Sequence, residues 1–340
     1  MLCFLRGLHV GAQMLPAPIM PVRSDSVVFL NRDVTNWQLL SLMVDRDVSP
    51  SPIALPQRPL DTLIKHWQEA TAPRLNLVGG FGDLRPIQGY AAVATFYEAA
   101  ALWLRTGSAE YIDALERTLM GGLPDAMFHS PDAMERALAA QAMIDASQLV
   151  YATDSAGLYV NFYLNTFAHI VRGDTTDIIV DQSTAMPWQG MVKLRVQSGN
   201  HRTLVTTLRL RLPEWADERP TLFINGHETD YNVQQGYAVI RRQWMRYDEL
   251  YLVFNTLPRP IDVAGGQVFR CGPVVYCAQE IKSTFKPHIL SAAAPDEQTG
   301  HPRYSLSSAN PSDSSQVMLC PYFEVEPSSR TAVLPYFTTP

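Results

Sequence analysis

The spacing of apolar residues changes once along the chain, at Asp154, and this change restricts the possible folds more than any other feature. Before it, apolar residues recur every three or four positions, as in residues 60–67, where two leucines, an isoleucine and a tryptophan share one helical face. After it, every second position of residues 158–164 carries leucine, valine or phenylalanine. The sequence therefore predicts an α+β chain of more than one domain, with helices over residues 59–153 and an antiparallel β-sandwich over residues 154–340.

Residues 1–58 show no single period and are predicted to be an irregular leader or linker. The stretch from Ser49 to Pro59 contains too many prolines for a helix or a central strand. Residues 37–44 (WQLLSLMV) are the candidate helix in this part. Whether the leader adds strands to the sandwich stays open at this point.

Four helices are predicted from their apolar faces and from the signals at their ends. The glycine-rich residues 78–83 break the first helix, and six alanines in the second allow close contacts between helices. Proline and glycine positions mark the remaining ends. The expected bounds are Pro59 to Val78 for the first helix, Tyr90 to Leu104 for the second, the N-cap Ser108 to Gly121 and Gly122 for the third, and Ser130 with Pro131 to Tyr151 for the fourth.

The β region is predicted from short alternating runs that glycine, proline, asparagine and aspartate separate, which is the spacing of an antiparallel sandwich. Residues 283–315 are predicted to be a long polar loop, with two strands after it. Tyr237, Trp244 and Trp188 could stack on sugar rings, but aromatic residues in strands usually belong to the core.

Charge and cysteine content exclude several classes of protein. The chain has 27 basic and 33 acidic residues, a net charge of −6, which argues against a nucleic-acid partner. No segment approaches the about 18 apolar residues of a membrane span, and Arg6 interrupts the apolar start that a signal peptide needs. We therefore expect a cytoplasmic protein with no membrane partner.

The four cysteines Cys3, Cys271, Cys277 and Cys320 are too few for a disulfide framework in a chain of 340 residues. A bridge between Cys271 and Cys277 stays open, because a glycine–proline step separates two strand-like runs there. Buried reduced thiols are the favoured interpretation.

Carboxylates are the best general candidates for catalysis, since two of them in one cleft can hydrolyse a glycoside. Glu98, Asp83 and Asp132 are the candidates here, although a helix face turned to solvent would also explain Glu98. The glycines at 79–82 lack the spacing of a phosphate-binding loop, and the eight histidines lack zinc-site spacing.

Several segments, in order and spacing, resemble glycoside hydrolase family 127, the β-L-arabinofuranosidase family. In the helical part, residues 67–82, ending in VGGFG, are similar to the family's helix and TGGIG turn, and residues 106–122 to its TGD helix. The resemblance covers residues 60–340 and implies the last helices of an (α/α)6 barrel followed by a β-sandwich. The β segments that carry it are DSAGLYVNFY (154–163), MPWQGMVKLRV (186–196), LRLRLPEWA (208–216), LFINGHE (222–228), GYAVIRRQW (236–244), FRCGPVVYCAQE (269–280) and VLPYF (333–337).

The resemblance implies a mechanism as well as a fold. In the family a cysteine thiolate is the nucleophile, held on zinc by a Glu-x-Cys pair on a barrel helix and by a later Cys-Cys pair, with an upstream glutamate as general acid/base. Zinc would keep the sulfur deprotonated and placed for attack on the anomeric carbon.

The chain departs from this pattern at each catalytic position. Counted back from Thr106, the Glu-x-Cys pair falls on Gln88 and Tyr90, residues 120–151 contain no cysteine, and residues 71–97 contain no glutamate and only Asp83 as an acid. We therefore expect no retained zinc site, no cofactor and no family nucleophile. Residual sugar binding is expected near Gln88, Tyr90 and His129, which flank the place where the family's sugar sits.

Three functional hypotheses follow from the sequence. The first is a truncated family member, carbohydrate-active by descent but catalytically impaired, or a gene fragment, because about four helices are too few for a barrel of twelve. The second is a glycosidase that uses ordinary carboxylates such as Glu98 and Asp83. The third is a non-enzymatic module that binds carbohydrate or another protein. An incomplete barrel would expose Tyr90, Val93 and Ile112, so self-association or a partner chain is expected.

Overall fold

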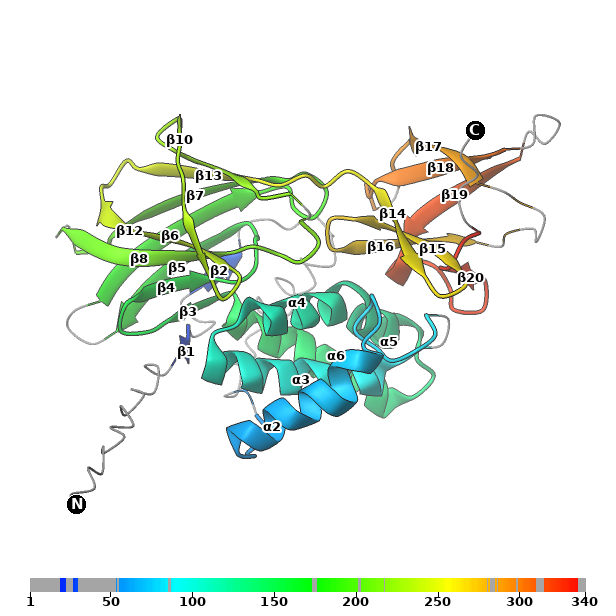
Figure 1. Cartoon of the computed structure of the whole chain (residues 1–340), viewed down its shortest axis with the longest axis horizontal. Helices are drawn as coiled ribbons and strands as arrows, with labels where there is room; N and C mark the ends of the chain where they lie inside the picture. Colours follow the sequence, from blue (N-terminus) through cyan, green and yellow to red (C-terminus); the bar gives the residue numbers. More distant parts are fainter. Residues whose placement is uncertain are drawn as a thin grey trace, which may run out of the picture.

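The helices form one layer against two β units in the computed structural model (Figure 1). A sandwich of two sheets lies on the left of that view, and a third sheet lies on the right. The described residues are 19–22, 27–29, 53, 55–84, 87–172, 176–200, 203–216, 218–279, 281, 285, 287–297, 299–309 and 315–335. The candidate helix at 37–44 and Cys3 lie outside them.

The helical layer consists of five α-helices joined by short π and 3-10 turns, counted over the described residues. The longest, α3, ends at Gly107, whose φ of 72° places it in the left-handed region while its N–H bonds the Trp103 carbonyl at 2.8 Å. The elements are α2 (Leu60–His66), η2 (Trp67–Thr71), η3 (Ala72–Arg74), α3 (Gly89–Thr106), α4 (Ala109–Arg117), η4 (Thr118–Gly122), α5 (Leu123–His129), α6 (Ala133–Ala146) and η5 (Ser147–Leu149).

Several of the predicted helix ends are wrong, including the end of the fourth helix, since Tyr151 lies in a β-strand. The chain does not stop at Gly121 and Gly122 but continues through η4 into α5. These glycines serve packing, because a Cβ on Gly121 would lie 2.4 Å from the Cβ of Val78. The fourth predicted helix, α6, begins at Ala133 rather than at Pro131, and its N-cap is Asp132, whose carboxylate accepts the Met134 N–H at 2.8 Å.

The first two sheets form the sandwich. Neighbouring strands in both sheets are antiparallel, except for β4 and β8, which are parallel. The first sheet has the order β1 (Met20–Pro21), β3 (Tyr151–Thr153), β4 (Gly157–Val160), β8 (Leu204–Arg211), β12 (Tyr237–Trp244), β11 (Asn232–Gln234). The second has the order β10 (His227–Glu228), β9 (Thr221–Ile224), β13 (Glu249–Val253), β7 (Met191–Ser198), β6 (Thr176–Thr184), β5 (Thr166–Arg172), β2 (Val27–Phe29).

The third sheet is a separate antiparallel unit, so a single sandwich does not account for all the strands after residue 154. The predicted polar loop at 283–315 is wrong, because it contains two paired strands of this sheet, β17 and β18. The sheet has the order β14 (Arg259–Val263), β15 (Gly266–Cys271), β16 (Val274–Gln279), β19 (Gln316–Pro321), β18 (Arg303–Ser308), β17 (Pro287–Ala293), while β20 (Arg330–Thr331) pairs with β16 and η6 (Tyr322–Glu324) follows β19.

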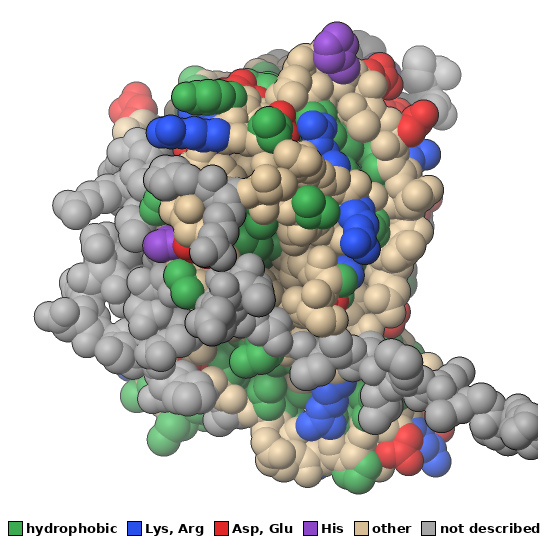
Figure 2. All heavy atoms as spheres, turned by 90° about the vertical axis from the view of Figure 1, so that its left-hand side faces the viewer, with side chains coloured by type: hydrophobic (Ala, Val, Ile, Leu, Met, Phe, Trp, Pro, Cys, Tyr) green, Lys and Arg blue, Asp and Glu red, His purple; other side chains and the backbone are tan. Residues whose placement is uncertain are grey.

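The predicted fold class, a partial helical region followed by an antiparallel β-sandwich, is confirmed. Tyr237 and Trp244 are buried, as expected of core aromatics, and Trp188 is half-buried. The predicted domain boundaries at residues 58 and 153 stay predictions. None of the described helices is long and apolar enough to cross a membrane. At the sandwich end, acidic, basic and apolar side chains are interspersed over the part of the surface coloured by type (Figure 2).

Two of the three residues that an incomplete barrel was predicted to expose are buried. Val93 and Ile112 are buried, at 8% and 0% exposure, because α2, α3 and α4 pack against one another and share one core with the sandwich. The Trp67 and Tyr111 rings, for example, pack edge to face with their centroids 5.3 Å apart. Of the three residues named, only Tyr90 is exposed, at 48%.

A buried charged cluster joins the helices to the sandwich. Arg211 of β8 is fully buried and donates to Asp113 at 2.6 Å, to Glu116, and to the Asn161 carbonyl at 2.6 Å. Trp215 donates to the second oxygen of Glu116 at 2.7 Å. The buried guanidinium of Arg211 is thus the cationic partner of two buried carboxylates, those of Asp113 and Glu116. Burial raises the pKa of Asp113 to about 7. The positive charge of Arg211 acts to lower this pKa, and the negative charge of Glu116 acts to raise it.

Asp113 is expected to make stability depend on pH. Its pKa is higher in the folded chain than in the unfolded chain, where it is 3.8, so the folded state binds the proton more tightly. This contribution is complete below the unfolded pKa and is lost as pH rises through about 7, so the free energy of unfolding should fall between about pH 4 and 7. Urea titrations should show a shallower fall for Asp113→Asn, and an unchanged slope would contradict the assignment.

Candidate functional site

A hydrogen-bonded loop between η3 and α3 forms one wall of the candidate site. The Asn76 side-chain oxygen accepts the N–H groups of Val78 and Gly80, at 3.0 and 2.9 Å. Gly79 has a φ of 79°, and a Cβ there would lie 2.5 Å from the Thr118 side chain. At Gly79 the loop is therefore held against the η4 turn with no room for a side chain.

Gln88 closes this loop from the other end. Its side-chain oxygen accepts the N–H of Phe81, and its amide nitrogen donates to the carbonyl of Asp83. A Cβ on Gly80 would lie 2.5 Å from that oxygen. Both ends of the Gln88 amide therefore hold the loop in place.

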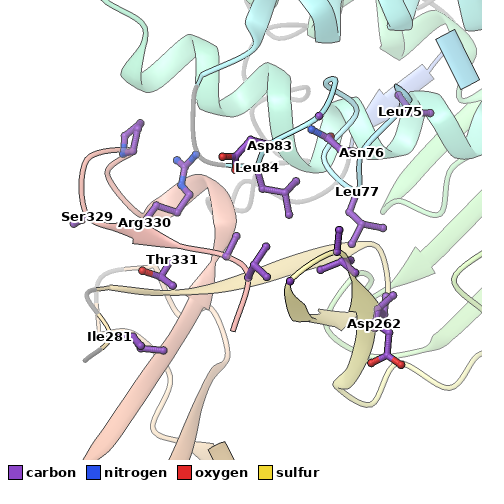
Figure 3. Close-up of a pocket in the computed structure, with 18 of the residues that line it drawn as sticks. Leu75, Asn76, Leu77, Asp83, Leu84, Asp262, Ile281, Ser329, Arg330 and Thr331 are labelled. Carbon is purple, nitrogen blue, oxygen red and sulfur yellow. The ribbon is translucent and has the colours of Figure 1, made fainter. Parts of the chain in front are cut away.

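An open groove of about 1140 Å³ lies between this loop and the third sheet (Figure 3). This volume exceeds the about 300–1,000 Å³ of a site for a single small molecule. Aliphatic side chains alternate with polar ones along it, and the amide nitrogen of Asn76 is a buried donor that has no acceptor among the described residues. The described lining residues are Leu75, Asn76, Leu77, Gly82, Asp83, Leu84, Ile261, Asp262, Val263, Ala264, Gly265, Ile281 and residues 327–333.

A buried ion pair fixes the far wall of the groove to the helices. Arg330 of β20 donates from two nitrogens to the Asp125 carboxylate of α5, at 3.0 Å for the longer bond, and both residues are buried. The guanidinium also lies 3.8 Å from the centre of the Tyr322 ring, whose hydroxyl donates to the Leu84 carbonyl at 2.7 Å. These contacts set the distance between the loop and the third sheet.

Of the predicted site residues, Asp83 lines the groove, Gln88 supports its loop, and the others lie elsewhere. Tyr90 is exposed outside the groove, where its hydroxyl donates to Asp132 at 2.5 Å. This hydrogen bond raises the pKa of Tyr90 and lowers that of Asp132. His129 joins α5 to η6 through the Phe323 carbonyl at 3.1 Å.

Glu98 does not face solvent, so that interpretation is wrong. It is 9% exposed, accepts the Thr71 hydroxyl at 2.7 Å and lies 2.6 Å from Nδ1 of His66. Its two oxygens therefore join α2 and η2 to α3. Asp262 and Arg330, which sequence patterns did not single out, line the groove instead.

The described cysteines are buried and reduced. Cys277 lies directly opposite Cys320 on the paired strands β16 and β19, and Cys271 bonds the Thr256 carbonyl at 2.8 Å. Burial raises the pKa of each of these thiols. The preference for buried thiols over a bridge between Cys271 and Cys277 is confirmed.

Comparison with known proteins decides which family this fold resembles. Residues 157–256 match the family described as "Beta-L-arabinofuranosidase, GH127 middle domain". The resemblance to glycoside hydrolase family 127 is confirmed. The matched segment runs from β4 to the residues after β13, which is most of the sandwich.

Solved structures extend this likeness to the helices and the third sheet. A GH127 β-arabinofuranosidase superposes with a TM-score of 0.69 at 20% identity, over 88% of this chain and 58% of its own. A GH127 β-L-arabinofuranosidase from Geobacillus stearothermophilus T6 gives 0.63 at 20% identity, over 76% and 53%. A structure titled glycoside hydrolase gives 0.61 at 16% identity, over 76% and 54%.

The chain spans between a half and three fifths of the length of these three solved structures. At such identities the likeness concerns the fold alone. No curated protein sequence matches the chain.

Gln88 and Tyr90, which the resemblance places at the family's Glu-x-Cys positions, do not fit a zinc ion. The amide of Gln88 is used twice within the loop, and the phenol of Tyr90 is turned to Asp132. Zinc in proteins takes thiolate, imidazole or carboxylate ligands, and neither an amide nor a protonated phenol belongs to that set. No catalytic step through zinc follows from this arrangement.

Proposed function

We propose that the chain is a carbohydrate-binding relative of GH127 that lacks the family's zinc-held thiolate and is catalytically impaired. The groove beside the glycine loop carries this proposal, because that loop is one of the segments near which the resemblance implies residual sugar binding, and because the groove has a volume of about 1140 Å³. The absent Glu-x-Cys and Cys-Cys pairs support the loss of hydrolysis. A cytoplasmic location stays a prediction.

The lining of the groove suits a hydroxyl-rich ligand with apolar faces. Carboxylates such as Asp83 and Asp262 accept hydrogen bonds from hydroxyl groups. Aliphatic residues such as Leu77 and Val263 can cover the C–H faces of sugar rings. By analogy with the names of the solved relatives, L-arabinose oligosaccharides are the first ligands to test.

Filling the groove should abolish this binding. Ala264 lies in the turn between β14 and β15 at the groove wall, so Ala264→Trp should weaken binding of an L-arabino-oligosaccharide at least about tenfold. Saturation-transfer NMR and calorimetry would measure it. Leu257→Trp is the matched control, because Leu257 is 74% exposed and does not line the groove. Absence of binding by the unmodified chain would refute the proposal.

The loss of the zinc mechanism has its own measurement. The purified chain should contain no stoichiometric zinc and should not release the aryl group from an aryl β-L-arabinofuranoside. One tightly bound zinc per chain would contradict this part of the proposal, and it would leave the binding result unaffected.

A second candidate function is hydrolysis by ordinary carboxylates, which the shared position of Asp83 and Asp262 on the groove favours. Glu98 no longer belongs to this hypothesis, because its oxygens serve Thr71 and His66. A panel of aryl glycosides, tested on the chain and on Asp83→Asn, decides it. Turnover that Asp83→Asn abolishes supports this function, and no turnover rejects it.

A further inference from the structure

A second pocket, of about 270 Å³, is formed by the sandwich alone among the described residues. Its lining comes from both sheets, since Ile179 of β6 and Gln197 of β7 belong to one sheet and Trp244 of β12 to the other. It shares no described lining residue with the groove beside the glycine loop. Its volume lies just below the about 300–1,000 Å³ of sites for drug-sized molecules, so a ligand of about one sugar ring suits it.

Two hydrogen-bonded turns form the rim of this sandwich pocket. After β7, the Gly199 N–H donates to the Asp177 carbonyl at 3.0 Å, and a Cβ on Gly199 would lie 2.0 Å from the Asp177 carboxylate. After β12, the Met245 N–H donates to the Asp248 carboxylate at 3.0 Å, and the Asp248 N–H donates to the Met245 carbonyl at 3.0 Å. Arg246 lies inside this second turn, so its backbone is held at the rim.

Polar side chains of the sandwich pocket are not used elsewhere in the fold. Among the described residues, the Arg246 guanidinium, the Gln197 amide and the Thr203 hydroxyl have no hydrogen-bonding or ion-pair partner, and Arg246 only lies beside the Tyr247 ring. The Gln243 amide donates at 3.5 Å to a thioether sulfur, which is a weak acceptor. These groups are therefore available to a ligand.

The charge of the lining selects the class of ligand. Arg246 is the charged residue among the described lining residues. Two carboxylates adjoin the rim, and each has a partner of its own: Asp177 lies 2.8 Å from Nε2 of His169, and Asp248 lies 3.2 Å from the Arg242 guanidinium. A carboxylate on a ligand would thus find an available guanidinium, which can donate two parallel hydrogen bonds to it.

The floor of the sandwich pocket is apolar and fixed in position. Ile179 and Trp244 supply it, and the Trp244 ring nitrogen donates to the Thr206 carbonyl at 3.1 Å, which sets the orientation of the ring. Such a floor can cover the C–H groups of a sugar ring.

The remaining polar groups suit the hydroxyl groups of such a ring. The amides of Gln197 and Gln243 and the hydroxyl of Thr203 can each donate and accept hydrogen bonds, as sugar hydroxyls do. We propose that the sandwich pocket binds a uronate, a monosaccharide that carries a carboxylate. Arg246 holds the carboxylate, and the two amides and the threonine hold the hydroxyl groups.

Titration of sodium D-galacturonate into the full chain tests this proposal, with calorimetry and saturation-transfer NMR as the measurements. The unmodified chain should bind it, and Arg246→Met should raise the dissociation constant at least about tenfold. The matched control is Arg241→Met, which removes the same charge from an exposed position of β12 outside the pocket and should change the constant less than about twofold. Absence of binding by the unmodified chain, or equal losses in the two variants, would overturn the proposal.

Two further ligands separate the contributions of charge and ring. D-galactose, which has the ring without the carboxylate, and sodium acetate, which has a carboxylate without the ring, should each bind at least about tenfold more weakly than galacturonate. Equal binding of galactose would reject the role of Arg246, and equal binding of acetate would reject the sugar ring as part of the ligand.

The sandwich pocket and the groove can be tested separately. Ala264→Trp, which fills the groove, should leave galacturonate binding unchanged, because Ala264 does not line the sandwich pocket. Loss of galacturonate binding in this variant would assign the ligand to the groove and overturn the proposal. Failure of the chain to bind L-arabino-oligosaccharides would leave it unaffected.

Discussion

Replacing Arg330 by methionine is expected to lower the free energy of unfolding by about 3–5 kcal/mol, because it leaves the Asp125 carboxylate buried without its cation. Asp125 is 1% exposed and accepts both bonds from Arg330. The Val325 carbonyl would lose a donor as well. Urea unfolding at neutral pH, followed by tryptophan fluorescence, would measure the change.

The double variant Asp125→Leu with Arg330→Met is the informative control. It removes both charges, and replacing a buried pair by apolar residues is often neutral, so most of the lost stability should return. A double variant as unstable as Arg330→Met alone would show that packing of the arginine on the Tyr322 ring, rather than the ion pair, holds the third sheet in place.

Replacing Arg211 by leucine is expected to have a comparable effect at the junction of helices and sandwich, about 3–5 kcal/mol at pH 8. Two carboxylates, Asp113 and Glu116, would be left without their cation in the core. The loss should shrink at pH 5, because carboxylates that cannot remain charged in the interior take up protons.

Unfolding of Arg211→Leu at both pH values checks this prediction. Arg195→Leu is a suitable comparison, because the Arg195 side chain is about half exposed and its partner Glu249 is also open to solvent. Its effect should be much smaller than that of Arg211→Leu. Equal losses for the two arginines would mean that burial of the Arg211 cluster contributes nothing.

The fold was predictable wherever apolar periodicity was strong. Strand β4 follows the alternation at 158–160, and α3 follows its apolar face and its glycine end. Strands β17 and β18 were missed because their residues are mainly serine, alanine and other small or polar types, so period-two contrast is weak. The continuation of η4 into α5 was missed because two glycines read as a stop although they serve close packing against Val78 and Ala92.

The candidate site was predictable only in part. Asp83 and Gln88 were identified because they lie in or next to the glycine loop. Asp262 and Arg330 come from strands more than 170 residues further along the chain, and no local pattern relates them to that loop. Glu98 was misplaced because the identity of one residue does not tell which side of an alanine-rich helix is covered.

The sequence by itself determined the order of helical and β regions and the family resemblance, since each depends on residue identity and local spacing. Tertiary structure alone decided that Val93, Ile112 and Glu98 are buried, that a groove opens between the glycine loop and the third sheet, and that Met134 and Leu138 of α6 are exposed. These features depend on contacts between distant segments, in which burial and ion pairing are settled by what packs against a residue and not by its neighbours in sequence.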